Sequence, residues 1–126
     1  MYSSVPLVPT GKVFTSNADA KVDVRETAPV TLRTMMVTSG VLMIEIKQGK
    51  GHKPPPHSHP DHDSILYLAK GRMSITIGER TWIASAGDAW HHPPGVVHHS
   101  EALEDCTVVE IKNPPRQTWP DSPPRR

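Results

Sequence analysis

Two histidines separated by a single residue are the first feature of the sequence that points to chemistry. His57 and His59 lie in the segment PPPHSHPDHDS. Residues i and i+2 of a β-strand point to the same face, so two imidazoles at this spacing can bind one metal ion. Asp63 offers a carboxylate oxygen four residues later, and His98 can complete the ligand set where the fold brings it back. These residues predict one divalent transition metal, and the donors are compatible with iron, manganese, nickel, zinc or copper.

The other histidines have no partner that strand geometry would fix. Four of them are interpreted as solvated polar side chains: His52, His62, His91 and His99. His92 precedes Pro93, near the expected mouth of the fold, and is not assigned either way.

Alternation of apolar and polar residues predicts the strands that must position this site. In residues 41–47, Leu42, Ile44 and Ile46 fall on one side, with the period of two that is typical of a β-strand. The same alternation, or a run of β-branched and aromatic residues, recurs in residues 31–37, 72–78, 80–85 and 106–112. Fourteen prolines exclude a helical bundle. The sequence therefore predicts an all-β sandwich or barrel with little or no helix.

The last of these segments carries charged residues that could serve catalysis. Alternation places Val108, Glu110 and Lys112 on one face of residues 106–112. If Val108 faces a cavity, Glu110 faces it too. A solvated strand end is the equal alternative for Glu110, and a surface position is preferred for Lys112. Tyr67 either donates a proton or hydrogen bond, or is a core aromatic with its hydroxyl at the rim.

Arginine, tryptophan and cysteine residues complete the candidates. Arg33 and Arg116 have the side chain that binds a carboxylate through two parallel hydrogen bonds, and each is equally compatible with a surface position. Trp82 and Trp90 are predicted to be packing residues. Cys106 is predicted to be a small buried apolar residue.

Composition and charge exclude several classes of protein. The chain has 126 residues, of which 36% are hydrophobic and 21% charged, as is typical of one folded domain. Fourteen lysines and arginines nearly balance thirteen acidic residues, so a dedicated nucleic-acid binder is not expected. The longest apolar stretch, residues 41–44, is too short to cross a bilayer, and the first residues do not resemble a secretory signal. Together with the single cysteine, these features predict a cytoplasmic protein.

Two longer patterns resemble the motifs of the cupin superfamily. Their shared residues are Gly51, His57, His59, an acidic residue and Gly71 for the first motif, and Gly87, Pro93, Gly95 and His98 for the second, with Ala102 in place of its final asparagine. This resemblance covers residues 40–112 and implies a double-stranded β-helix, or jelly-roll barrel, with one metal near its mouth. It implies that His57, His59 and His98 are ligands. Counting forward from His59 assigns the fourth position to Asp63, counting back from Gly71 assigns it to Ser64, and water is the third alternative.

A narrower resemblance points to the small single-domain cupins of the pectin-degradation type, which open the ring of 4,5-unsaturated uronates. It rests on the segments HSHPDHDSILYLAKGRMSITIG and GDAWHHPPGVVHHSEALEDCTVVEIKNPPRQTW. The resemblance implies that Glu110 is a proton shuttle and that Arg116 binds the substrate carboxylate. The chain departs from that group near Asp63, where glutamine is usual, at Glu110, where aspartate is usual, and at Lys112, where phenylalanine is usual.

These observations lead us to expect a mononuclear metal enzyme for a small carboxylated or sugar-acid substrate, acting by isomerisation, elimination or ring opening. The alternatives are an iron-dependent dioxygenase and a ligand-binding cupin without turnover. One domain is expected over residues 1–126, with an N-terminal arm at 1–29, the barrel at about 30–112 and a proline-rich C-terminal arm at 113–126. The Met-rich strand at 35–43 predicts a homodimer, and neither a nucleic acid nor a membrane is expected as a partner.

Overall fold

The computed structural model describes residues 4–16, 21–25 and 30–119, with the backbone alone for 21–25. In these residues the chain forms strands and no helix, which confirms the all-β prediction. The strands are β1 (Val5–Pro6), β2 (Lys21–Arg25), β3 (Val30–Val37), β4 (Leu42–Gln48), β5 (Asp63–Lys70), β6 (Arg72–Ile77), β7 (Arg80–Ser85), β8 (Ala89–His92), β9 (His98–Ala102), β10 (Cys106–Asn113) and β11 (Arg116–Gln117). No helix long and apolar enough to cross a membrane occurs in this described part.

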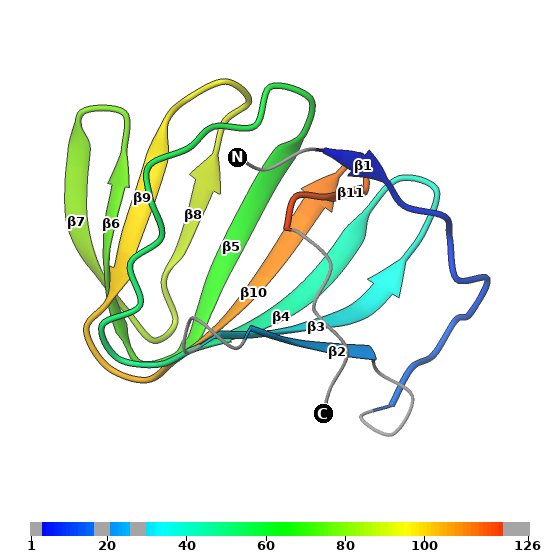
Figure 1. Ribbon diagram of the computed structural model, residues 1–126, viewed down its shortest axis with the longest axis horizontal. Helices are drawn as coiled ribbons and strands as arrows, with labels where there is room; N and C mark the ends of the chain where they lie inside the picture. Colours follow the sequence, from blue (N-terminus) through cyan, green and yellow to red (C-terminus); the bar gives the residue numbers. More distant parts are fainter. Residues whose placement is uncertain (1–3, 17–20, 26–29, 120–126) are drawn as a thin grey trace.

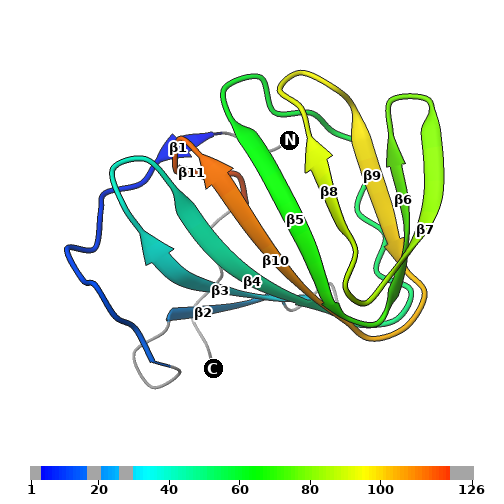
Figure 2. The ribbon, with the colours of Figure 1, turned by 180° about the vertical axis from the view of Figure 1, so that it is seen from behind.

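The strands form two larger antiparallel sheets, as a jelly-roll barrel requires. One sheet has six strands in the order β2-β3-β4-β10-β5-β8, and the other has three in the order β7-β6-β9. Figures 1 and 2 show β6, β7 and β9 at one end of the molecule and β2, β3 and β4 at the other, with β5 and β10 between them. Strand β10 pairs with β4 on one side and β5 on the other, so it lies in the middle of the larger sheet.

Alternating burial along the strands separates an inner from an outer face. On β4, Leu42 and Ile44 are fully buried, as the period of two predicts. On β10, burial alternates from Cys106 through to Lys112, so Val108 and Glu110 share the inner face. This parity confirms the faces predicted for both strands. The inner apolar residues provide the core around which the sheets pack.

A backbone contact joins the two segments that carry the conspicuous histidines. His57 lies in the loop between β4 and β5, and it forms an isolated antiparallel bridge with His98, the first residue of β9. The His57 N–H donates to the His98 carbonyl at 3.1 Å, and the His98 N–H donates to the His57 carbonyl at 2.8 Å. Two side chains that are forty-one residues apart in sequence are therefore neighbours.

All five segments predicted as strands are strands in the structure, as β3, β4, β6, β7 and β10. Of the predicted arms, Val5–Pro6 pairs with Arg116–Gln117, so the N-terminal and C-terminal segments meet as β1 and β11. The parts of those arms at residues 1–3, 17–20, 26–29 and 120–126 lie outside the described residues.

Candidate metal centre

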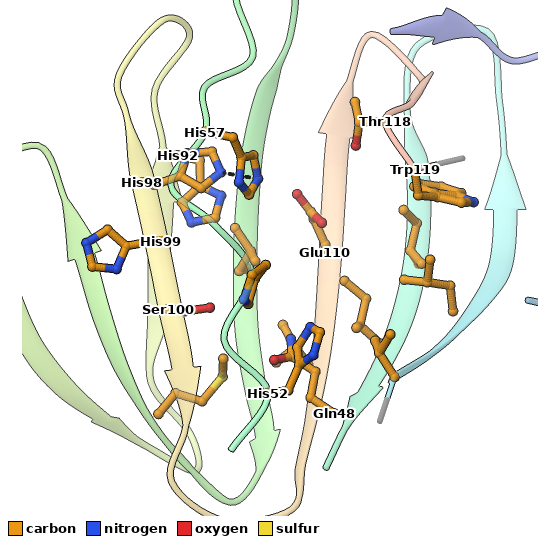
Figure 3. Close-up of a pocket in the computed structure, with 18 of the residues that line it drawn as sticks. Gln48, His52, His57, His92, His98, His99, Ser100, Glu110, Thr118 and Trp119 are labelled. Atoms are coloured by element: carbon orange, nitrogen blue, oxygen red, sulfur yellow. Dashed lines mark hydrogen bonds between the residues drawn. The ribbon is translucent and has the colours of Figure 1, made fainter. Parts of the chain in front are cut away.

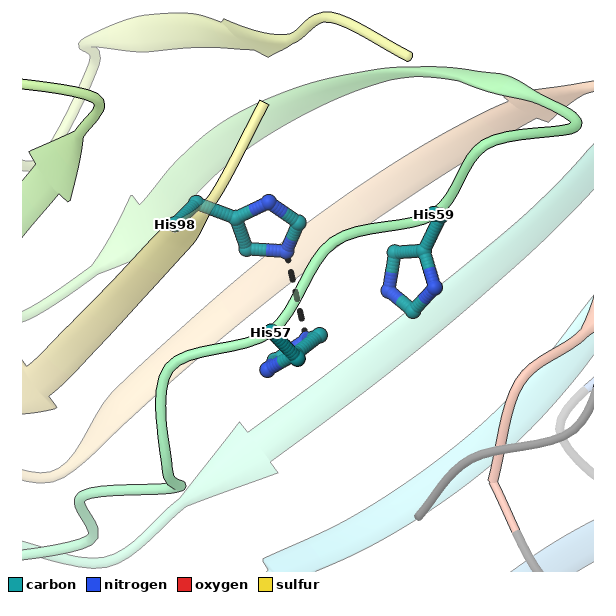
Figure 4. A group of neighbouring side chains, drawn as sticks. All are labelled: His57, His59 and His98. Atoms are coloured by element: carbon teal, nitrogen blue, oxygen red, sulfur yellow. Dashed lines mark hydrogen bonds between the residues drawn. The ribbon is translucent and has the colours of Figure 1, made fainter. Parts of the chain in front are cut away.

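Three imidazoles converge where the loop before β5 lies beside the start of β9. One ring nitrogen from each of His57, His59 and His98 lies within 4.8 Å of the others. Figure 4 shows the three rings facing a common centre, with His98 reaching it from β9 and the other two from the loop. The tertiary structure thus brings together the three histidines that the sequence analysis selects.

Backbone carbonyls orient two of these rings. His57 Nδ1 lies 2.8 Å from the Pro55 carbonyl oxygen, and His98 Nδ1 lies 3.3 Å from that of Val96. A carbonyl oxygen only accepts, so both Nδ1 atoms carry the proton and donate it. Each Nε2 is then left with its lone pair, which is the arrangement found in metal-binding histidines.

The two Nε2 atoms face each other at 3.2 Å. Two lone pairs at this separation repel, unless a proton or a cation lies between them. Nitrogens that bind one zinc-like ion at about 2.0–2.1 Å in tetrahedral geometry are themselves about 3.3–3.4 Å apart. The separation and the donor types therefore fit a divalent transition metal, and the arrangement of lone pairs is explained by one.

Burial keeps the rings of His59 and His98 neutral, as metal ligands must be. Burial, and after it the positive charge of Lys112, lowers the pKa of His59 to about 3. Burial likewise lowers the pKa of His98 to about 4, with His57 as the next cause. At neutral pH both rings are uncharged, and each can bind a cation through its unprotonated nitrogen without first releasing a proton.

The trio opens into a cavity of about 310 Å³ between the two sheets. Glu110 lines it from the middle of β10 and is 8% exposed. Figure 3 shows the Glu110 carboxylate pointing toward the histidines. Of the two equal alternatives for Glu110, the structure shows the cavity-facing one. The surface position preferred for Lys112 is wrong, because Lys112 lines the same cavity and is 2% exposed.

The structure does not bring Asp63 to the trio. Asp63 is the first residue of β5 and lies on its exposed face, where its carboxylate contacts the ring of His91. Ser64, the next residue, is on the inner face and is 2% exposed. Because side chains alternate along a strand, Asp63 and Ser64 cannot both face inward. The choice of Asp63 as a ligand is therefore corrected, and the inner position belongs to Ser64.

The same alternation corrects the role suggested for Tyr67. Tyr67 shares the outer face of β5 with Asp63 and is 48% exposed. Its hydroxyl is on the other side of the sheet from the cavity, so it is not placed to donate a proton there.

Neither predicted arginine lines the cavity. Arg116 is the first residue of β11, and its Nε lies 3.3 Å from Asp61 Oδ2. Arg33 Nε lies 3.2 Å from Glu45 Oε1. The structure thus places Arg116 in an ion pair at the barrel rim, whereas the resemblance implies contact with the substrate carboxylate.

The interpretation of four histidines as solvated is wrong for His62. His62 is 3% exposed, its ring stacks on that of His59 with centroids 4.7 Å apart, and its Nδ1 lies 3.0 Å from Asp61 Oδ1. His52 and His99 also line the cavity. His91 is on the exposed side of β8, beside Asp63.

His92 is a cavity residue that the sequence analysis leaves open. Its ring stacks on His98 with centroids 3.7 Å apart and an angle of 11° between the planes. Trp90 Nε1 donates a hydrogen bond to His92 Nε2 at 3.2 Å. An indole N–H only donates, so His92 Nε2 must accept, and its proton lies on Nδ1. Burial lowers the pKa of His92 to about 2, so the ring stays neutral. The signal for its inward position is its two-residue spacing from the buried Trp90 on β8.

Comparison with known families and structures agrees with this geometry. The sequence matches the family described as "Cupin domain" over residues 35–112. None of the curated proteins matches the chain.

Several solved structures share the fold. The structure of KdgF from Halomonas sp. has a TM-score of 0.77 and 25% identity, over 84% of this chain and 96% of that one. An RmlC-like cupin from Shewanella frigidimarina has a TM-score of 0.76 and 16% identity, over 83% and 93%. The polyketide cyclase RemF from Streptomyces resistomycificus has a TM-score of 0.66 and 20% identity, over 86% and 85%.

Proposed function

The chain belongs to the cupin domain family, and from that premise we propose that it is a metal-dependent enzyme for a small carboxylated or sugar-acid substrate. The reaction class is isomerisation, elimination or ring opening. The observation that carries the proposal is the pair of Nε2 lone pairs of His57 and His98, 3.2 Å apart. Both rings are oriented from behind by carbonyls, and His59 provides a third donor.

His57, His59 and His98 would hold the ion. Bound there, a divalent metal would supply Lewis acidity toward an oxygen of the substrate. With only three protein ligands, positions remain for substrate or water, as in catalytic rather than structural sites.

Glu110 is the proton-transfer group of the proposal. It is buried in the cavity wall and faces the histidines, so its carboxylate can accept a proton from one substrate atom and return it to another. The Nδ1–H of His92, whose tautomer is set by Trp90, is a neutral hydrogen-bond donor beside the same centre. A cavity of about 310 Å³ is at the small end of ligand pockets, which suits a compact substrate.

Likeness to KdgF, together with the resemblance to the pectin-degradation-type cupins, supports uronate ring opening as the specific reaction. This site differs from that group near Asp63, where glutamine is usual. It also differs in Arg116, which forms an ion pair with Asp61. We therefore propose the ring-opening reaction with Glu110 as proton shuttle, but without Arg116 as the contact to substrate.

Elemental analysis of purified variants tests the metal site. We expect His57→Ala and His98→Ala to lose the bound metal, and His52→Ala to retain it as the matched control from the same cavity. Incubation with a 4,5-unsaturated uronate in D₂O then tests the reaction. The conjugated absorbance should disappear and deuterium should enter the product. Glu110→Gln should slow this about 10²–10⁴-fold while keeping the metal. Metal retained by His98→Ala would rule out the ligand set, and no turnover by the loaded protein would rule out the reaction.

A dioxygenase is the second candidate, because three histidines with open positions also suit oxygen activation by iron. Oxygen consumption during turnover distinguishes it from isomerisation. The inward carboxylate of Glu110 argues against a third alternative, a ligand-binding cupin without turnover. The cytoplasm stays our predicted location.

A further inference from the structure

Lys112 lies inside the cavity although it is a lysine at the end of a strand. It is 2% exposed and is the largest of the fully buried residues in the described part of the chain. It follows Glu110 by two residues on the inner face of β10. It also lines the same cavity as His57, His59 and His98. No other lysine or arginine among the described residues does so.

The C-terminal segment holds the ammonium group in place. Lys112 Nζ donates to the hydroxyl of Thr118, a residue that is itself 7% exposed. It also lies 5.1 Å from the centroid of the Trp119 ring, within range of a cation–π interaction. An ammonium has three N–H donors, so the bond to Thr118 leaves two for a molecule in the cavity.

The positive charge of Lys112 is balanced only from a distance. Burial lowers the pKa of Lys112, and the negative charges of Glu110 and Asp61 oppose that effect. Asp61 is in an ion pair with Arg116. No ion pair found among the described residues joins Lys112 to a carboxylate. An ammonium removed from water in this way is stabilised by any anion that reaches it.

The residues that hold Lys112, Thr118 and Trp119, line the same cavity as the histidines. Figure 3 shows His57, His92 and His98 on one side of Glu110, and Thr118 and Trp119 on the other. A substrate that spans this cavity can therefore reach the Glu110 carboxylate. This is the position from which a proton can be moved along the substrate.

We propose that Lys112 Nζ, positioned by Thr118 and Trp119, binds the carboxylate of a small monoanionic substrate whose other oxygens reach the histidine trio. This inference rests on the proposed function and names the anchor of its substrate class. It assigns to Lys112 the charge recognition that Arg116, paired with Asp61 outside the cavity, does not supply.

Binding of D-glucuronate, compared with D-glucose, tests the subsite. The two probes differ in a carboxylate against a hydroxymethyl group, and affinities are measured by NMR titration of metal-loaded and EDTA-treated protein. We expect Lys112→Met to weaken glucuronate binding about 10- to 100-fold in both forms, because a charge-assisted hydrogen bond is lost. Glucose binding should not change. Lys112→Arg should restore most of the preference.

Two controls keep the result interpretable. Lys53→Met removes an exposed lysine and should leave both affinities unchanged. Thr118→Val retains the ammonium but removes its partner, so a loss of a few fold is expected even if Lys112→Met folds poorly. Glucuronate that binds Lys112→Met as tightly as wild type, or wild type that does not prefer glucuronate, overturns the inference.

The outcome is separable from that of the proposed function. Lys112-dependent binding in a protein that holds no metal would leave the subsite standing while the metal enzyme falls. A metal-loaded protein that turns over uronate with unchanged KM in Lys112→Met would overturn the subsite alone.

Discussion

Replacing Gly71 by alanine is expected to destabilise the fold strongly. Gly71 joins β5 to β6, where the chain passes from the larger to the smaller sheet, and its φ is +95°, a conformation that L side chains rarely adopt. Forcing alanine into it costs roughly 1–3 kcal/mol. A Cβ there would also lie 2.5 Å from the Asp105 carbonyl oxygen and 2.6 Å from Cys106 Sγ, so the start of β10 must shift. Such overpacking costs about 1–3 kcal/mol more.

The sum, roughly 2–6 kcal/mol, is a large part of the 5–15 kcal/mol that usually stabilises a domain. Gly87 is the matched control, because its φ is +99° but nothing lies within 4 Å of its added Cβ. Gly87→Ala should therefore cost only the backbone part. The assay is unfolding in urea, monitored by tryptophan fluorescence. Equal losses of unfolding free energy in the two variants would refute the contact with β10 as the cause.

Three further predictions concern the rim, the cavity and the outer surface. A hydrogen bond from Ser4, and after it one from His62, lowers the pKa of Asp61 to about 2. The ionised carboxylate therefore adds to the free energy of unfolding fully above pH 3.8, the ordinary pKa, and this contribution is lost as the pH falls through 2. Because the Asp61 side chain is 40% exposed, we expect Asp61→Asn to cost about 1 kcal/mol or less at pH 7 and clearly less at pH 2 in urea unfolding; a loss of unfolding free energy that does not change with pH would contradict this. Trp90→Phe should allow the His92 proton to move between its two ring nitrogens, which ¹⁵N NMR detects; a wild-type ring protonated on Nε2 would count against the assignment. We expect the protein to be a homodimer, because apolar side chains such as Ile65 remain 56% exposed; light scattering that gives a monomer at micromolar concentration would reject this.

Local patterns predict much of the fold and part of the site. A period of two in apolar residues reports which face of a strand is buried, and this depends only on alternation along the chain. It therefore identifies the inner faces of β4 and β10, and it places Glu110 beside Val108. The same rule, applied to β5 from Leu66 and Leu68, would have moved Asp63 and Tyr67 to the outer face. Asp63 was selected by motif spacing instead, which takes no account of side-chain direction.

The sequence by itself determined the residue types, the strand faces and the two segments whose histidines can share an ion. Only the tertiary structure decided which side chains meet, because that depends on the pairing of strands distant in the chain. The bridge of His57 with His98 aligns their Nε2 atoms, and the turn after β10 carries Thr118 back to Lys112. Lys112 is buried because partners supplied by this return make burial tolerable, and no local pattern contains them.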